Sequence, residues 1–324
     1  MTTIYRLVCI VFCCTNILFA SDPQGTDRID TTYTISSTAK NILKDYPGTS
    51  LVIPYKPADI SVDLNAIYKK IGKRELSADI YYSQMNLVNK KPAIIMIHGG
   101  GWRSGNKLME QYTAIQLASL GYFCIAIEYR LSPEAVYPAA VIDILDAVNW
   151  VKENGNKYSA DTSKIVLMGE SAGGHLASLA GIKWEYFYSI LLKKQGCQAN
   201  ISAIINIDGV MDMTVPSESG KDTIADKPSA AKQWIGYTFN DRPELWKGVS
   251  PVNYIDKNTP PMLFINSSMD RFHAGRDEAI EKMRLLNIYS EVHSIPDSPH
   301  SFWFFHPWID EALNYIKLFL DKVF

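Results

Sequence analysis

From about residue 90 onward, apolar residues are concentrated in short runs, and the segments between these runs have helical spacing. Runs of four to eight apolar residues bounded by turn residues are typical of buried strands. On this pattern we predict strands at residues 93–97, 122–127, 165–168, 201–207, 262–265 and 292–295. Between them, helical periodicity predicts helices at residues 108–120, 138–151, 172–180 and 308–320. Strands that alternate with helices predict a mostly parallel central sheet with helices on both faces, which is an α/β fold.

Two segments before residue 90 alternate apolar and polar side chains instead. Residues 65–71 and 75–82 flank Gly72-Lys73, and this arrangement predicts a β-hairpin. The hairpin would add antiparallel strands at one edge of the sheet. Residues 21–60 are polar and contain several prolines, so we expect an N-terminal extension packed on the domain surface.

The remaining chain, residues 61–324, is expected to form one catalytic domain. Residues 211–250 interrupt the alternation of strands and helices with short helical stretches, including residues 230–235. We interpret them as a small cap or insertion near the strand ends. Open α/β sheets bind ligands beyond the carboxyl ends of their strands, so the cap would lie close to any binding site.

The first 20 residues have the pattern of a secretory signal peptide. Arg6 ends a short positive region, and residues 7–20 form a mostly apolar stretch too short to span a membrane. Ala20 and Ser21 are small, as cleavage requires, although Leu18 is bulky for its position. The alternative is an uncleaved membrane anchor. We predict a secreted or periplasmic protein with no membrane association in its mature form.

Composition excludes several classes of partner. The formal net charge of -2 gives no reason to expect nucleic acid or an anionic membrane as a partner. Spacing of cysteine and histidine suggests no metal site, and we expect no cofactor. Beyond the signal segment only Cys124 and Cys197 remain; Cys124 lies in an apolar run, and a disulfide between the two is left open.

Two glycine-bracketed motifs carry the chemistry. Residues 169–174, GESAGG, follow a predicted strand and fit the G-x-S-x-G pattern, in which a serine sits on a strained strand-to-helix turn. Ser171 is therefore the candidate nucleophile; a serine that merely capped the following helix would not need small residues on both sides. Glu170 is expected to point away from the turn and to pack behind it. Residues 98–102, HGGGW, fit the loop that supplies oxyanion-hole amides, so Gly100, Gly101 and Ala172 are the candidate oxyanion donors.

The candidate general base is His300. In enzymes with this serine turn, the acid and then the histidine follow the serine along the chain. His300 lies in the loop after the last predicted strand, where such a base is expected, and His306 is the fallback. The others fit less well by order, spacing or strand position: His98, His175, His273 and His293.

The candidate acid is Asp270, because it follows the predicted strand at residues 262–265 on the next loop. Asp277 and Asp297 are the alternatives; the first should already lie within a helix, and the second is very near His300 in sequence. In the expected chemistry, His300 removes the proton of Ser171, which attacks an ester carbonyl, while the acid orients the imidazole.

Together these motifs resemble the hormone-sensitive-lipase-like α/β-hydrolases. The resemblance rests on HGGGW at 98–102, YRLSPE at 129–134 with PAA at 138–140, and GESAGGH at 169–175. It extends over roughly residues 60–324. More narrowly, the chain is similar to bacterial carbohydrate esterases that remove acetyl or feruloyl groups from plant cell-wall polysaccharides, and residues 299–303, PHSFW, and 306–308, HPW, strengthen this narrower similarity.

The resemblance implies a secreted serine esterase acting on acylated oligo- or polysaccharide, with acetyl the leading acyl group. Trp102 and Trp303 are candidate substrate-binding residues, since aromatic rings near the site can stack on sugars; the aromatic run at 302–305 with Trp308 has the alternative interpretation of a helix core. A feruloyl esterase, an esterase of uronate methyl esters and a general short-chain carboxylesterase or lipase remain alternatives. A serine peptidase with a propeller domain exceeds this length, and a non-catalytic binding protein would not need both Ser171 and His300.

Overall fold

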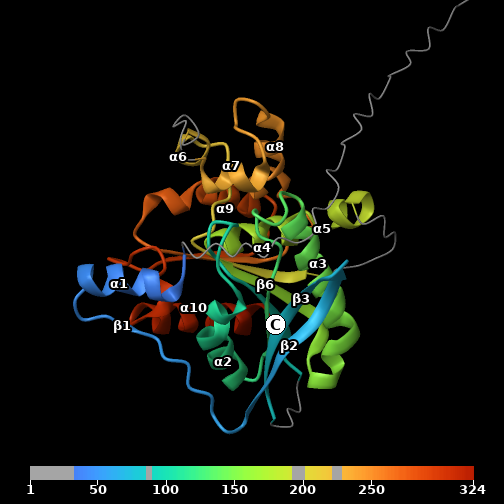
Figure 1. Ribbon diagram of the computed structural model, residues 1–324, viewed down its shortest axis with the longest axis vertical. Coiled ribbons are helices and arrows are strands. Elements are labelled where there is room, and N and C mark those ends of the chain that lie inside the picture. Colours follow the sequence, from blue (N-terminus) through green and yellow to red (C-terminus); the bar gives the residue numbers. More distant parts are fainter. Residues whose placement is uncertain (1–32, 85–89, 192–200, 221–227) are drawn as a thin grey trace, which may run out of the picture.

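An eight-stranded sheet forms the centre of the molecule in the computed structural model, which describes residues 33–84, 90–191, 201–220 and 228–324 (Figure 1). The predicted signal segment 1–20 and Cys197 lie outside these residues. The strand order is β2-β3-β5-β4-β6-β7-β8-β9. In chain order the strands are β2 (Ile60–Ile71), β3 (Arg74–Ser83), β4 (Pro92–Ile97), β5 (Phe123–Ile127), β6 (Asp161–Glu170), β7 (Ile201–Ile207), β8 (Met262–Asn266) and β9 (Ser290–Ser294).

The hairpin and the parallel sheet that the sequence predicts are both confirmed. Strands β2 and β3 are antiparallel, with Ile71 opposite Arg74 next to the turn, and β3 pairs antiparallel with β5. From β5 to β9 every neighbouring pair is parallel. Parallel strands end at the same edge, so the loops after β4, β6, β7 and β8 gather on one side of the molecule.

Both faces of the sheet are buried under helices. On β4, Ile94 and Met96 belong to one hydrophobic cluster while Ile95 and Ile97 belong to the other, and all four are fully buried. Full burial of such a side chain contributes about 1.5–3 kcal/mol, which explains why this strand is apolar throughout. One face is covered by α3 (Ala139–Asn154), α4 (Ala172–Ile182) and α9 (Arg276–Leu285), and the other by α1 (Ile35–Asp45), α2 (Gln111–Ser119) and α10 (Trp308–Val323).

The described part of the N-terminal extension packs on the α10 side. Thr34 and Ser37 cap α1 reciprocally, and Ile42 of α1 joins the hydrophobic cluster there. Strand β1 (Ser50–Leu51) then pairs antiparallel with β10 (Phe305–His306), so this extension is hydrogen-bonded to the segment that follows the last strand of the large sheet. The hydroxyl groups of Tyr33 and Ser301 lie 2.7 Å apart, and Ser301 directly follows His300 in the chain.

Three short helices of the segment 211–250 lie beyond the carboxyl ends of the strands (Figure 1). The buried side chain of Trp234 from this segment stacks on Trp102 of the glycine loop, with ring centroids 5.2 Å apart. The segment therefore forms one side of the space above the sheet. Its helices are α6 (Pro216–Ser219), α7 (Ala230–Ile235) and α8 (Pro243–Gly248).

Short helical turns connect the larger elements. They are η1 (Lys107–Glu110), η2 (Gly155–Tyr158), α5 (Trp184–Tyr186), η3 (Phe187–Leu191), η5 (Pro251–Tyr254), η6 (Asp270–His273) and η7 (Phe302–Phe304).

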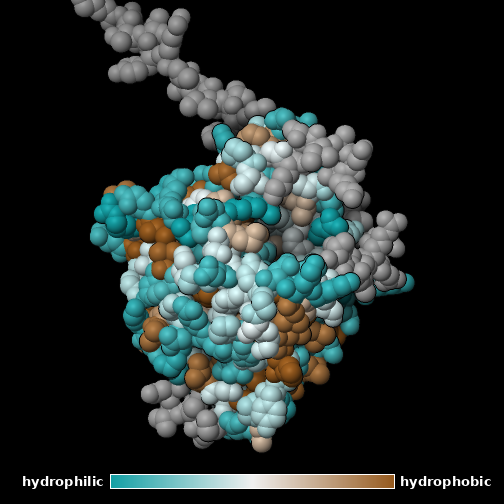
Figure 2. All heavy atoms as spheres, turned by 90° about the vertical axis from the view of Figure 1, so that its left-hand side faces the viewer, coloured by the Kyte–Doolittle hydropathy of each residue, from teal (hydrophilic) through white to brown (hydrophobic). Residues whose placement is uncertain are grey.

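Within the described parts of the chain, no helix has the length and apolar character that a membrane crossing requires. Hydrophilic residues predominate on the face shown in Figure 2, with separate hydrophobic patches between them.

Candidate active site

Ser171 occupies a sharp turn between β6 and α4. Its φ of 53° and ψ of -119° lie outside the regions that serine ordinarily adopts, and its N–H donates to the carbonyl of Ile207 at 2.8 Å. Tight packing makes the flanking glycines necessary: a Cβ on Gly173 would lie 1.8 Å from the carbonyl oxygen of Ile97, and one on Gly169 would lie 2.4 Å from the carbonyl carbon of Gly173. The turn has the strained strand-to-helix geometry that the G-x-S-x-G motif predicts.

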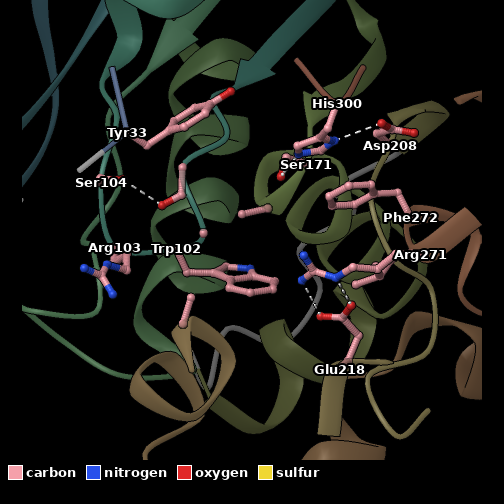
Figure 3. Close-up of a pocket in the computed structure, with 15 residues that line it drawn as sticks. Tyr33, Trp102, Arg103, Ser104, Ser171, Asp208, Glu218, Arg271, Phe272 and His300 are labelled. Atoms are coloured by element: carbon pink, nitrogen blue, oxygen red, sulfur yellow. Dashed lines mark hydrogen bonds and ion pairs between the residues drawn. The ribbon is translucent and has the colours of Figure 1, made fainter. Parts of the chain in front are cut away.

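His300 lies against Ser171, as the sequence predicts. Its Nε2 is 2.9 Å from the Ser171 Oγ, and its ring stacks on Phe272 with centroids 3.5 Å apart. His306, the fallback base, is partly exposed and pairs with Asp310 instead. Figure 3 shows Ser171 directly beside His300 in the candidate pocket.

The partner of His300 is Asp208, so the prediction of Asp270 is wrong. The Nδ1 of His300 lies 2.9 Å from Oδ2 of Asp208, which is fully buried directly after β7. Asp270 is fully exposed, and its carboxylate lies 3.7 Å from the Nδ1 of His273. The alternatives Asp277 and Asp297 are exposed as well. The loop after β8 leads the Asp270 carboxylate away from the site, while the end of β7 faces it.

Backbone and side-chain donors hold the Asp208 carboxylate in place. Its Oδ1 accepts from the Ser267 N–H at 2.8 Å and from the Asn266 amide at 3.3 Å, leaving Oδ2 for the imidazole. The Asp208 N–H donates to the carbonyl of Ile265, and its φ of 52° turns the side chain back toward the serine. In the sequence, Asp208 immediately follows the apolar run at 201–207, but this signal alone does not distinguish it from Asp270, which follows the run at 262–265.

Electrostatics keep His300 in its neutral form. Burial lowers the pKa of His300, the hydrogen bond and charge of Asp208 raise it in part, and the nearby cation of Arg271 lowers it again, so that the pKa lies below the ordinary value of 6.5. At neutral pH, with Nδ1 donating to Asp208, Nε2 is free to accept the proton of Ser171. This is the arrangement that a general base needs.

The predicted oxyanion donors surround the same pocket. Gly100, Gly101 and Ala172 all line it together with Ser171. Gly100 has a φ of 113°, and a Cβ there would lie 2.2 Å from the carbonyl oxygen of Ser104, so the loop requires glycine at this position. Ala172 opens α4, and the first N–H groups of a helix have no partner within the helix. The arrangement lets backbone amides reach a carbonyl oxygen bound next to Ser171.

Of the two predicted substrate-binding tryptophans, only Trp102 lines the pocket. Its indole N–H donates to the Nδ1 of His175 at 3.2 Å, and the Nε2 of His175 bonds the carbonyl of Val249 at 2.7 Å. Burial lowers the pKa of His175 to about 4, so the ring is neutral and can accept from Trp102. These contacts connect the glycine loop to helix α4 and to the segment after α8.

The prediction that Trp303 binds substrate is wrong for this pocket, because Trp303 does not line it. It is 3% exposed, and the edge-to-face contact of its ring with His300 has a centroid distance of 5.0 Å. The whole aromatic run belongs to the hydrophobic cluster under α10, in agreement with the alternative interpretation of these residues as core. That cluster includes Phe302, Trp303, Phe304, Phe305 and Trp308.

The pocket has a volume of about 460 Å³, within the range of small-molecule sites. Figure 3 shows Trp102 and Ser104 on one side of Ser171, with Phe272 and Arg271 on the other. Sequence reasoning missed several lining residues because loops and the N-terminal extension bring them in from distant positions. They are Tyr33, Arg103, Ser104, Asp208, Val210, Glu218, Ala230, Arg271 and Phe272.

A pair of buried carboxyl groups lies outside the pocket. Glu170, next to Ser171 in sequence, is 2% exposed and does not line the pocket, as predicted. Burial raises the pKa of Glu110 to about 7 and raises that of Glu170 as well, and the two side chains interact with each other. Two buried carboxyls in contact cannot both ionise at low cost, so a shared proton is the favoured state.

Among the described residues, no group of three or more potential metal ligands is present.

Several curated esterases are similar to this chain in sequence. Among curated proteins, the esterase LipC of Mycobacterium tuberculosis is 29% identical over 180 residues, which is 55% of this chain and 44% of LipC. The match covers about half the length of LipC and of two further curated esterases of the same organism.

Solved structures give the same fold. A bifunctional GH43-CE protein of Bacteroides eggerthii is 25% identical, with a TM-score of 0.67 over 81% of this chain and 38% of that protein. A truncated carbohydrate esterase from gut microbiota is 22% identical, with a TM-score of 0.66 over 82% of this chain and 99% of that protein. The family model BD-FAE matches residues 78–274, more than half of the chain. The chain therefore belongs to the BD-FAE family, within the hormone-sensitive-lipase-like α/β-hydrolases.

Proposed function

We propose that this protein is a serine esterase that removes acyl groups, with acetyl preferred, from plant cell-wall carbohydrates. The observation that carries the proposal is the single imidazole of His300, which bridges the Ser171 hydroxyl and the buried Asp208 carboxylate at 2.9 Å on each side. A hydroxyl, a neutral imidazole and a carboxylate in this order form a Ser-His-Asp triad, placed next to amides that can stabilise an oxyanion.

The reaction follows from this geometry in two halves. His300 takes the proton of Ser171 as the Oγ attacks the ester carbonyl, and amides of Gly100, Gly101 and Ala172 hold the tetrahedral oxyanion. The C–O bond to the alcohol then breaks, His300 gives its proton to the leaving oxygen, and an acyl-serine remains. In the second half, water attacks the acyl-serine with His300 as base, and the collapse of the second tetrahedral intermediate releases the acid and frees Ser171.

Asp208 stabilises the imidazolium that forms at each proton transfer, since its charge is buried and fixed by Ser267 and Asn266. Each oxyanion donor is typically worth about 10²–10³-fold in rate. An ester suits this chemistry, since His300 holds the proton that the departing alkoxide needs.

Three lines of support point to a carbohydrate ester. One structural neighbour is named a carbohydrate esterase, and another is named a bifunctional GH43-CE protein. The motifs at 98–102, 169–175 and 299–303 resemble bacterial esterases that act on polysaccharides. The signal-like segment at residues 1–20 would place the enzyme in the periplasm or outside the cell, where such substrates occur.

Product analysis tests the proposal. Purified protein is incubated with acetylated xylan, acetylated pectin and feruloylated arabinoxylan, and acetate and ferulate are quantified, with Ser171→Ala as the control. We expect acetate release that disappears in the variant. Release of ferulate alone would move the assignment to a feruloyl esterase, and cleavage of 4-nitrophenyl acetate without action on any polysaccharide would leave a general short-chain carboxylesterase.

A further inference from the structure

Arg271 presents a fixed hydrogen-bond donor to the pocket that the chemistry of ester cleavage does not use. It lies on η6, in the loop that follows β8, and lines the same pocket as Ser171. Its Nε donates to Oε1 of Glu218 at 2.7 Å, and its Nη2 donates to Oε2 at 3.1 Å. Glu218 is on helix α6 of the 211–250 segment, so this ion pair joins that segment to the core of the fold.

The two partners differ sharply in exposure. The side chain of Glu218 is 3% exposed, whereas that of Arg271 is 45% exposed. Figure 3 shows Glu218 on the side of the guanidinium away from Ser171, so the uncovered edge of Arg271 faces the pocket. A guanidinium has five N–H donors, and Glu218 takes two of them. Three donors in fixed directions remain for a ligand.

We propose that Arg271, oriented by Glu218, binds neutral hydroxyl or ring oxygens of the sugar that carries the scissile ester. This inference rests on the proposed function and specifies the alcohol side of its substrate. An acetyl group has only its carbonyl oxygen as a strong acceptor, and the backbone amides near Ser171 bind that oxygen. A further set of donors in the pocket therefore has its acceptors in the alcohol part.

The charges around Arg271 favour neutral acceptors over a carboxylate. The buried anion of Glu218 offsets the guanidinium charge at close range, and the Asp208 carboxylate is a second buried anion near the pocket. Arg103 also lines the pocket, but Figure 3 shows its guanidinium turned away from Ser171 and Arg271. Because Glu218 offsets its charge, this guanidinium attracts an acidic group less strongly, while its remaining N–H groups can still donate to sugar oxygens.

Steady-state kinetics on two substrates test the inference. The variants are Arg271→Gln and Arg271→Lys, and the substrates are acetylated xylo-oligosaccharides and 4-nitrophenyl acetate, whose alcohol part has no sugar oxygens. A hydrogen bond to a charged donor contributes about 1.5–3 kcal/mol, which corresponds to about 10–100-fold in kcat/KM. We expect Arg271→Gln to lose that factor on the oligosaccharide, mainly through KM, and at most about threefold on 4-nitrophenyl acetate. Arg271→Lys keeps the charge beside Glu218 but loses the fork geometry, so its kcat/KM on the oligosaccharide should lie between those of the wild-type protein and Arg271→Gln.

The matched control is Arg242→Gln, which makes the same change in an exposed Arg–Glu pair. It should leave kcat/KM on both substrates unchanged. Loss of the same factor on both substrates in Arg271→Gln, or no selective loss on the oligosaccharide, would overturn the inference while leaving the esterase assignment intact. If the wild-type protein cleaves neither substrate, the proposed function itself fails.

The variant Glu218→Gln separates neutral from acidic recognition. It removes the offsetting charge and loosens the guanidinium, so activity on neutral acetylated xylo-oligosaccharides should fall while activity on acetylated oligogalacturonides falls less or rises. If instead the wild-type protein strongly prefers acetylated oligogalacturonides and Arg271→Gln abolishes that preference, Arg271 recognises a carboxylate and the proposal for neutral sugar oxygens is wrong.

Discussion

Replacing Asp208 by asparagine tests the identity of the acid, where sequence and structure disagree. The substitution keeps the size of the side chain and the acceptor for the Ser267 N–H, but it removes the charge 2.9 Å from the Nδ1 of His300. An asparagine amide that donates to Nδ1 forces the imidazole to hold its proton on Nε2. In that tautomer the ring cannot accept the proton of Ser171.

The expected loss follows from both effects together. An Asp→Asn change in a Ser-His-Asp hydrolase lowers kcat about 10⁴-fold, or roughly 5 kcal/mol in the activation free energy. We expect Asp208→Asn to lose about 10³–10⁴-fold in kcat on 4-nitrophenyl acetate. The matched control is Asp270→Asn, whose fully exposed carboxylate lies 3.7 Å from His273 and has no contact with His300. It should keep activity within about twofold, since exposed ion pairs contribute little.

The assay is the initial rate of 4-nitrophenolate release at pH 8, with circular dichroism to establish that each variant is folded. A collapse of activity in Asp270→Asn, together with a loss of less than about tenfold in folded Asp208→Asn, would refute the assignment of Asp208. It would mean that the loop after β8 rearranges when substrate binds.

His175, His300 and Glu110 each give a further testable expectation. His175→Phe removes the acceptor of the Trp102 indole N–H, so kcat should fall about tenfold with little change in KM. His175→Gln should recover part of this loss. An unchanged kcat in His175→Phe would show that the glycine loop does not need this hydrogen bond. Because the pKa of His300 is lowered and its neutral form is the active base, the acidic limb of the kcat/KM profile should lie below pH 6.5, and a limb above 6.5 would contradict this electrostatic account. The pKa of Glu110 is raised to about 7, so its contribution to stability is present below pH 4.5 and is lost as pH rises through 7. The Tm of Glu110→Gln minus the Tm of the wild-type protein should therefore be larger at pH 8 than at pH 5. An equal Tm difference at the two pH values would refute this.

Features encoded locally could be predicted from the sequence. The apolar runs locate the strands because both faces of a parallel sheet are buried, and they place Ser171 at the end of β6. His300 follows from chain order, since the base comes after the last strand. The glycine loop follows from its composition, because Gly100 sits at a φ that other residues rarely adopt.

The acid and the pocket walls could not be predicted, because both depend on which loops turn toward the serine. Asp208 and Asp270 each follow a parallel strand, and only the path of the backbone, with a φ of 52° at Asp208, directs one carboxylate to His300. Trp303 is adjacent to the site in sequence but packs under α10. Glu218 and Arg271 are 53 positions apart in sequence, so their pairing at the pocket wall is a property of the tertiary structure.

Covalent labelling identifies the nucleophile directly. The protein is treated with diethyl 4-nitrophenyl phosphate, in which the Ser171 Oγ would displace 4-nitrophenolate and gain a diethylphosphoryl group, and the adduct is located by peptide mass spectrometry. We expect one adduct, on the peptide that contains Ser171, which is absent in Ser171→Ala and forms more slowly in Asp208→Asn. An adduct on another residue, or labelling of Ser171→Ala at the wild-type rate, would contradict it.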